Sequence, residues 1–118
     1  MTFREFLVPS DDEILDTFGV DVEPIDDFIR GFTLDDPEHD GGTLAFSYDV
    51  PGRSVRCRWT RGDKVLLDVF REGATRLTVW WRSGTGGIDV TIETDSLEGR
   101  FAVTLEEGIS ITDSLLLV

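Results

Sequence analysis

This sequence of 118 residues is poor in the residue types on which small stapled domains and many enzymes depend. Cys57 is its only cysteine, which excludes an intramolecular disulfide and fits a reducing compartment. His39 is its only histidine, and no nucleophile lies beside it in the sequence, so the chain has no Ser-His-Asp or Cys-His pattern. No segment approaches the roughly 18 apolar residues of a membrane-spanning helix, and residues 1–6 do not resemble an export signal. We therefore expect a cytoplasmic protein that is not an enzyme and uses no cofactor.

Positive charge is scarce as well, with 11 Lys and Arg against 24 Asp and Glu and a net charge of −13. Residues 1–42 hold thirteen of the acidic residues against Arg4 and Arg30, a local net charge of −11, whereas residues 43–83 carry a local net charge of +4. A strongly acidic surface repels nucleic acid and membranes, and it raises the association rate with basic partners. The charge pattern therefore predicts a basic protein partner, with no binding of nucleic acid or membrane.

Apolar residues are plentiful, at 40% of the chain with eight Phe and three Trp, which is enough for the core of one domain spanning 1–118. Near the N-terminus, Ser10 and Glu13 form the capping-box pattern, and Gly19 supplies a C-terminal stop. These signals predict a short helix over residues 10–18.

From about residue 25 the apolar residues recur with period two, as in Leu44, Phe46 and Tyr48, and turn signals separate the runs. The pattern predicts a mainly β (α+β) fold: a curled antiparallel β-meander, sandwich or open barrel, of about eight strands with one short N-terminal helix. Alternation places Trp59 and Trp81 inward and Trp80 outward. Residues 83–87 are expected to form a flexible glycine-rich loop, and the apolar residues on both sides of strand 65–70 are compatible with cover on both faces.

Two acidic clusters are candidates for chemistry, and both have simpler explanations. Glu38, His39 and Asp40 offer oxygen and imidazole ligands, but a lone histidine in an acidic hairpin loop is more often a solvated turn residue, and we expect no metal. The carboxylates of residues 11–16, with Asp26 and Asp27, could pair for acid and base work. Capping of the helix and its dipole already account for those carboxylates, so we expect no catalytic residues.

Two surfaces are candidates for partner binding. The first is the acidic loop, residues 35–42. The second is an outward row of Arg and Trp, expected beside Arg56 and Arg58 if the strands are neighbours. Such a row fits pairing with the acidic N-terminal segment, a protein interface, or a single-stranded nucleic-acid platform, although the net charge of −13 disfavours the last. The predicted partner-binding residues of both surfaces are Asp35, Asp36, Glu38, Asp40, Arg76, Trp80 and Arg82.

The order of these features resembles a known class of proteins. The chain has, in order, a short helix, an acidic stretch, the segment Thr-Leu-Ala-Phe-Ser-Tyr-Asp-Val-Pro at residues 43–51, strands that include Leu-Leu-Asp-Val at 66–69, and an apolar tail. This order is similar to that of the small acidic immunity proteins of bacterial polymorphic toxin systems, in particular the immunity protein 50 family. The resemblance extends over about residues 10–116. The resemblance implies a non-enzymatic protein that neutralises a cognate toxin, with an acidic surface suited to a basic toxin domain such as a nuclease. The alternative is an accessory or homodimeric domain that binds a small ligand or a protein partner through the sheet face.

Overall fold

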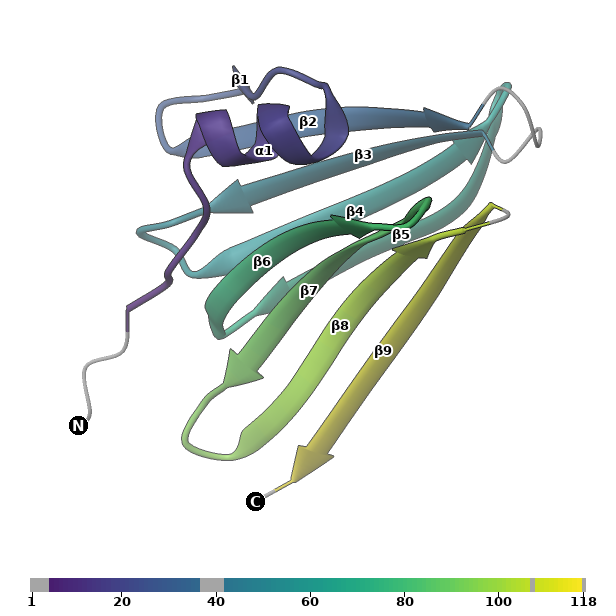
Figure 1. Cartoon of the computed structure of the whole chain (residues 1–118). Coiled ribbons are helices and arrows are strands. Elements are labelled where there is room, and N and C mark those ends of the chain that lie inside the picture. Colours follow the sequence, from purple (N-terminus) through teal and green to yellow (C-terminus); the bar gives the residue numbers. More distant parts are fainter. Residues whose placement is uncertain (1–4, 37–41, 107, 118) are drawn as a thin grey trace.

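The computed structural model describes residues 5–36, 42–106 and 108–117, and it forms a two-layered β-structure with one helix (Figure 1). The helix α1 spans Asp11–Phe18. Strands β1 to β5 pair in sequence order as one antiparallel sheet, and β6 to β9 pair in sequence order as a second. The strands are β1 (Glu23–Pro24), β2 (Ile29–Asp36), β3 (Gly42–Asp49), β4 (Ser54–Arg61), β5 (Lys64–Glu72), β6 (Ala74–Arg82), β7 (Thr85–Glu93), β8 (Leu97–Leu105) and β9 (Ile109–Leu117). The predicted antiparallel meander, curled into a sandwich, is confirmed.

The helix begins and ends where the sequence predicts. The Ser10 hydroxyl accepts a hydrogen bond from the Glu13 N–H at 3.1 Å, and the Glu13 carboxylate accepts one from the Ser10 N–H at 3.5 Å. Gly19 has φ +71 and donates its N–H to the Leu15 carbonyl at 2.7 Å. A left-handed glycine of this kind satisfies a carbonyl that the last turn would otherwise leave unpaired. Ile14 on the inner side of the helix is fully buried.

The core lies between the inner faces of the two sheets. On β3 the residues Leu44, Phe46 and Tyr48 are buried, while Ala45 between them is exposed. On β7 the inward residues are Ile88, Val90 and Ile92, which belong to the same apolar cluster. Alternation of this kind along β3, together with the inward residues of β7, builds one shared core and leaves the other face of each sheet outward.

The chain passes from the first sheet to the second through a single glycine. Gly73 separates β5 from β6 and has φ +86, a backbone conformation that other residues adopt only with strain. The N–H groups of Gly73 and Ala74 both donate to the Arg53 carbonyl at 2.9 Å, and the Glu93 N–H donates to the Gly73 carbonyl at 2.8 Å. This corner divides the meander into two layers.

Contacts from distant parts of the chain hold the sides of the sandwich together. Leu7 forms a parallel bridge to β6, donating to the Thr75 carbonyl at 2.9 Å. Asp11 at the start of α1 forms an ion pair with Arg30 of β2. At the opposite edge, Arg71 of β5 and Asp113 of β9 pair across the gap between the sheets. In the part of the chain that the structure describes, no helix is long and apolar enough to cross a membrane.

Three details differ from the sequence-based expectations. Trp81 is 54% exposed, so the prediction that it is buried is wrong. It does lie on the opposite face of β6 from Trp80, as alternation predicts. It is exposed because it lies near the end of β6, where the other sheet does not cover it. Trp59 is partly buried against the core. The glycine-rich segment is not a loop beyond residue 84, because Gly86 and Gly87 belong to β7 and make room for the rings of the two tryptophans on β6.

Candidate partner-binding groove

The acidic loop lies at the hairpin between β2 and β3. Asp35 is exposed near the end of β2, and its carboxylate accepts a hydrogen bond from the Thr43 hydroxyl at 2.8 Å. Asp36 is the last residue of β2. Glu38, Asp40 and the candidate ligand His39 lie outside the described residues. The structure thus places one of the four predicted acidic side chains on the outward face of the five-stranded sheet.

The predicted row of Arg and Trp divides between the two sheets. Arg76, Trp80 and Arg82 alternate with inward residues on β6, whereas Arg56 and Arg58 lie on β4, which belongs to the other sheet. β4 and β6 are therefore not neighbours, and a single continuous row does not form.

Trp80 is tied into its own sheet. Its indole N–H donates to the Asp89 carboxylate of β7 at 2.9 Å, and Arg100 of β8 donates to the same carboxylate through Nε at 3.0 Å. Arg76 and Arg82 are exposed, and neither forms an ion pair with any residue in the described ranges. Pairing of this row with the acidic N-terminal segment is therefore not seen among the described residues.

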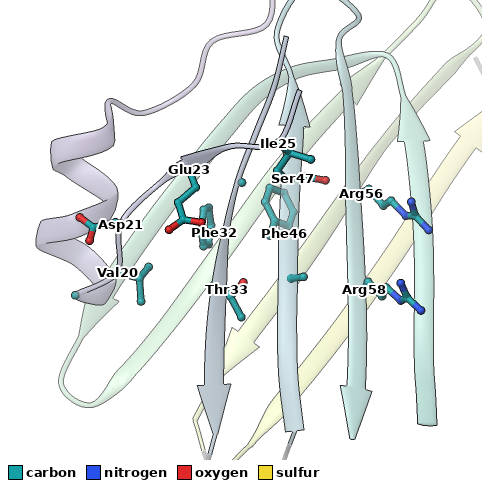
Figure 2. Close-up of a pocket in the computed structure, with 13 residues that line it drawn as sticks. Val20, Asp21, Glu23, Ile25, Phe32, Thr33, Phe46, Ser47, Arg56 and Arg58 are labelled. Carbon is teal, nitrogen blue, oxygen red and sulfur yellow. The ribbon is translucent and has the colours of Figure 1, made fainter. Parts of the chain in front are cut away.

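A groove of about 540 Å³ crosses the outward face of the five-stranded sheet (Figure 2). It runs from the segment that follows α1, over β2 and β3, to β4. Its lining residues are Gly19, Val20, Asp21, Glu23, Ile25, Gly31, Phe32, Thr33, Ala45, Phe46, Ser47, Arg56 and Arg58. The sequence predicts a place on a binding surface for only two of these residues, Arg56 and Arg58, and it predicts them in a row with residues of β6.

The floor of the groove is formed by small outward side chains in cross-strand register. Gly31 pairs with Ser47, and Thr33 pairs with Ala45. A methyl group on Gly31 would lie 2.7 Å from the Ile25 Cδ1 and 2.8 Å from the Phe46 carbonyl oxygen. Glycine at this position therefore lets Ile25 lie close to the sheet, which holds one wall of the groove in place.

The two walls carry opposite charges. Asp21 and Glu23 are exposed on the wall that follows α1, and Arg56 and Arg58 extend from β4 on the other side, with Thr33 and Ser47 between them (Figure 2). The groove is therefore dipolar: acidic along one side, basic along the other, and lined between them by small side chains.

The two arginines differ in how their charges are satisfied. Arg56 donates to both carboxylate oxygens of Asp68 on β5, at 2.9 Å and 2.6 Å. This bidentate hydrogen bonding lowers the pKa of Asp68 and raises the pKa of Arg56. Arg58 also faces Asp68 across the register and contributes to its lowered pKa, but it forms no ion pair within 4 Å in the described part of the chain. Its guanidinium is left with donors for a ligand.

An apolar extension continues the groove toward β5. A second hollow of about 220 Å³ shares Ile25, Ser47 and Arg56 with the first, and it reaches Phe70. Phe70 is 53% exposed and Ile25 is 63% exposed. Leu66 of β5 is exposed too, so the outward face of β5 is uncovered, against the interpretation that this strand is covered on both sides.

The groove offers carboxylates, guanidinium groups, hydroxyls and apolar side chains for non-covalent contacts. Cys57 of β4 points to the opposite side, into the core, where burial and then the charge of Asp68 raise the pKa of its thiol to about 12. Residues 5–36, 42–106 and 108–117 contain no group of three or more side chains placed to hold a metal ion.

Comparison with solved structures shows a shared fold. A chain in the contact-dependent growth inhibition toxin–immunity protein complex from Klebsiella pneumoniae 342 superimposes with a TM-score of 0.80 at 16% sequence identity, covering 97% of this chain and 100% of that chain. No family model and no curated protein match the sequence. The shared fold agrees with the resemblance to immunity proteins of toxin systems that the order of sequence features indicated.

Proposed function

We propose that this protein is a non-enzymatic, cytoplasmic immunity protein, which binds a cognate protein toxin and neutralises it. The observation that carries the proposal is the fold shared, over nearly the whole chain, with a component of a toxin–immunity protein complex. The net charge of −13 supports the inhibitor role, because a protein with so little positive charge is a poor ligand for nucleic acid and a good one for a basic protein.

The partner in this proposal is a basic toxin domain. Residues 1–42 carry a net charge of −11, and within the described part of this segment Arg30 is already paired with Asp11. The excess carboxylates remain available to attract positive charge over a distance of about one Debye length, roughly 8 Å at physiological ionic strength. Asp35, Asp36, Glu38 and Asp40 of the acidic loop are proposed to steer the encounter. Arg76, Trp80 and Arg82 on the other sheet are proposed as a second contact surface.

The proposal is tested by co-expression with the toxin domain encoded next to this gene. The toxin domain alone should arrest growth of a bacterial host, and co-expression of this protein should restore growth. The purified proteins should form a complex in size-exclusion chromatography. The matched control is an unrelated acidic protein of similar size and charge, which should neither restore growth nor bind.

The same experiment separates the alternatives. Failure to protect, together with the absence of a complex, would overturn the immunity proposal. A stable homodimer of this protein that does not bind the toxin domain would instead support the accessory-domain alternative.

A further inference from the structure

We infer that the dipolar groove on the five-stranded sheet receives a single segment of the toxin, which presents a basic side chain to Asp21 and Glu23 and an acidic side chain to Arg58. This inference rests on the proposed function and deepens it by naming the contact surface and the chemistry of the contacting segment. Three features of the groove carry the inference: unpaired charges of both signs, a width that suits one secondary-structure element, and an apolar end.

The first feature is the set of unpaired charges. Asp21, Glu23 and Arg58 form no ion pair with any residue that the structure describes, whereas Arg56 beside them is held by both oxygens of Asp68. An ion pair between Arg58 and the acidic wall would span the floor of small residues, and none forms. A segment that carries both signs of charge would satisfy both walls at once, and a purely basic segment would meet repulsion at Arg58.

The second feature is the width of the groove. Glu23 lies on β1 and Arg58 on β4, so the walls are three strand positions apart, or about 14 Å at about 4.8 Å per strand. An α-helix with its side chains is about 10–12 Å across, and an extended strand is narrower. One such element therefore fits between the walls, with its backbone over Thr33, Ala45 and Ser47.

The third feature is the apolar end at Ile25 and Phe70, where large side chains are more than half exposed. Partly exposed aromatic residues beside a charged pair are typical of the centre of a protein interface. A small ligand fits less well, because pockets for small molecules enclose most of the ligand surface, and the walls of this groove are exposed.

The groove and the acidic loop should affect different steps of binding. Charges that act before contact mainly change the association rate, whereas charges that pair within the contact mainly change the dissociation rate. Changes in the groove should therefore shorten the lifetime of the complex, even at salt concentrations that screen long-range attraction.

The test is the binding kinetics of the adjacent gene's toxin domain to the full-length protein with a charge reversed on each wall. Arg58→Glu and Glu23→Lys should each raise the dissociation rate about tenfold or more. The matched controls are Lys64→Glu in the β4–β5 hairpin and Glu98→Lys on β8, which make the same charge changes at exposed positions away from the groove, and they should stay within about threefold of wild type. All four side chains are exposed, so circular dichroism should match wild type, and thermal melts should show each variant folded at the assay temperature.

A second measurement keeps the test independent of the variants. Hydrogen exchange on the wild-type complex should show residues 19–25 protected by the toxin domain. Dissociation rates of the wall variants equal to those of the controls, or unchanged exchange in residues 19–25, would overturn the groove assignment while leaving the immunity proposal intact. No binding of wild-type protein would overturn the immunity proposal, and this inference with it.

Discussion

Two phenylalanines on the five-stranded sheet test the sandwich directly. Phe46 on β3 points inward and is 1% exposed, with its ring centroid 5.6 Å from that of Phe32. Phe70 on β5 points outward into the apolar end of the groove and is 53% exposed. The same change to alanine at both positions removes the same atoms from the same kind of backbone. We expect Phe46→Ala to be much more destabilising, because only that change opens a cavity between the sheets.

The expected magnitudes follow from burial. Truncation of a fully buried Phe costs about 3–5 kcal/mol of unfolding free energy, including the cavity term. A Phe buries roughly 150–250 Å² when fully covered, and about half of that is buried at Phe70. At about 25 cal/mol per Å² the loss is about 2–3 kcal/mol as an upper bound, with no cavity left behind. Phe46→Ala should therefore be the more destabilising change, by about 1–2 kcal/mol or more.

Urea denaturation followed by tryptophan fluorescence measures these losses, because neither change removes a tryptophan. The m-values should equal that of wild type, which ensures that midpoint shifts report stability alone. Equal destabilisation by the two changes would refute the assignment of inner and outer faces, since it would require both faces of the five-stranded sheet to be covered.

Three further predictions concern single features. Trp80→Phe should lower the free energy of unfolding in urea by about 1–2 kcal/mol, because the indole hydrogen bond to Asp89 is lost. Trp81→Phe should lower it by less than about 0.5 kcal/mol, because that ring is exposed. The reverse order would contradict the observed burial of the two tryptophans. The pKa of the Cys57 thiol is raised from 9.0 to about 12, so between these pH values the folded state keeps a thiol proton that the unfolded state loses. The free energy of unfolding should therefore fall between pH 9 and pH 12 more steeply for wild type than for Cys57→Ala. Iodoacetamide should label the thiol only in denaturant. Neutralising the four acids of the acidic loop with Asn and Gln should slow association with the toxin domain at low salt and leave the melting temperature unchanged; identical association rates across a salt series would exclude the loop as the steering surface.

The helix and the strand faces could be predicted because their signals are local. The capping box of Ser10 and Glu13 and the left-handed Gly19 set both ends of α1 within a few residues. Alternation of Leu44, Phe46 and Tyr48 sets the inward face of β3 without reference to any other strand. The resemblance to immunity proteins likewise followed from the order of such local features, and the shared fold agrees with it.

The candidate site could not be predicted, because its residues are distant in the sequence and each is ordinary by itself. Asp21 and Glu23 are two of thirteen acidic residues in the first 42, and Arg56 and Arg58 lie more than thirty positions later. Nothing in the spacing of either pair indicates that β1 to β4 place them on opposite sides of one groove.

The sequence by itself therefore determined the secondary structure, the face of each strand that turns inward along most of its length, and the charge that limits the choice of partner. The tertiary structure decided which inward and outward faces are covered and which charges meet. The physical reason is that a period of two fixes the side of a strand on which a residue lies but not what packs against that side. Trp81 is exposed on an inward-facing side, and the break at Gly73 separates Arg56 and Arg58 from Trp80 by assigning their strands to different sheets.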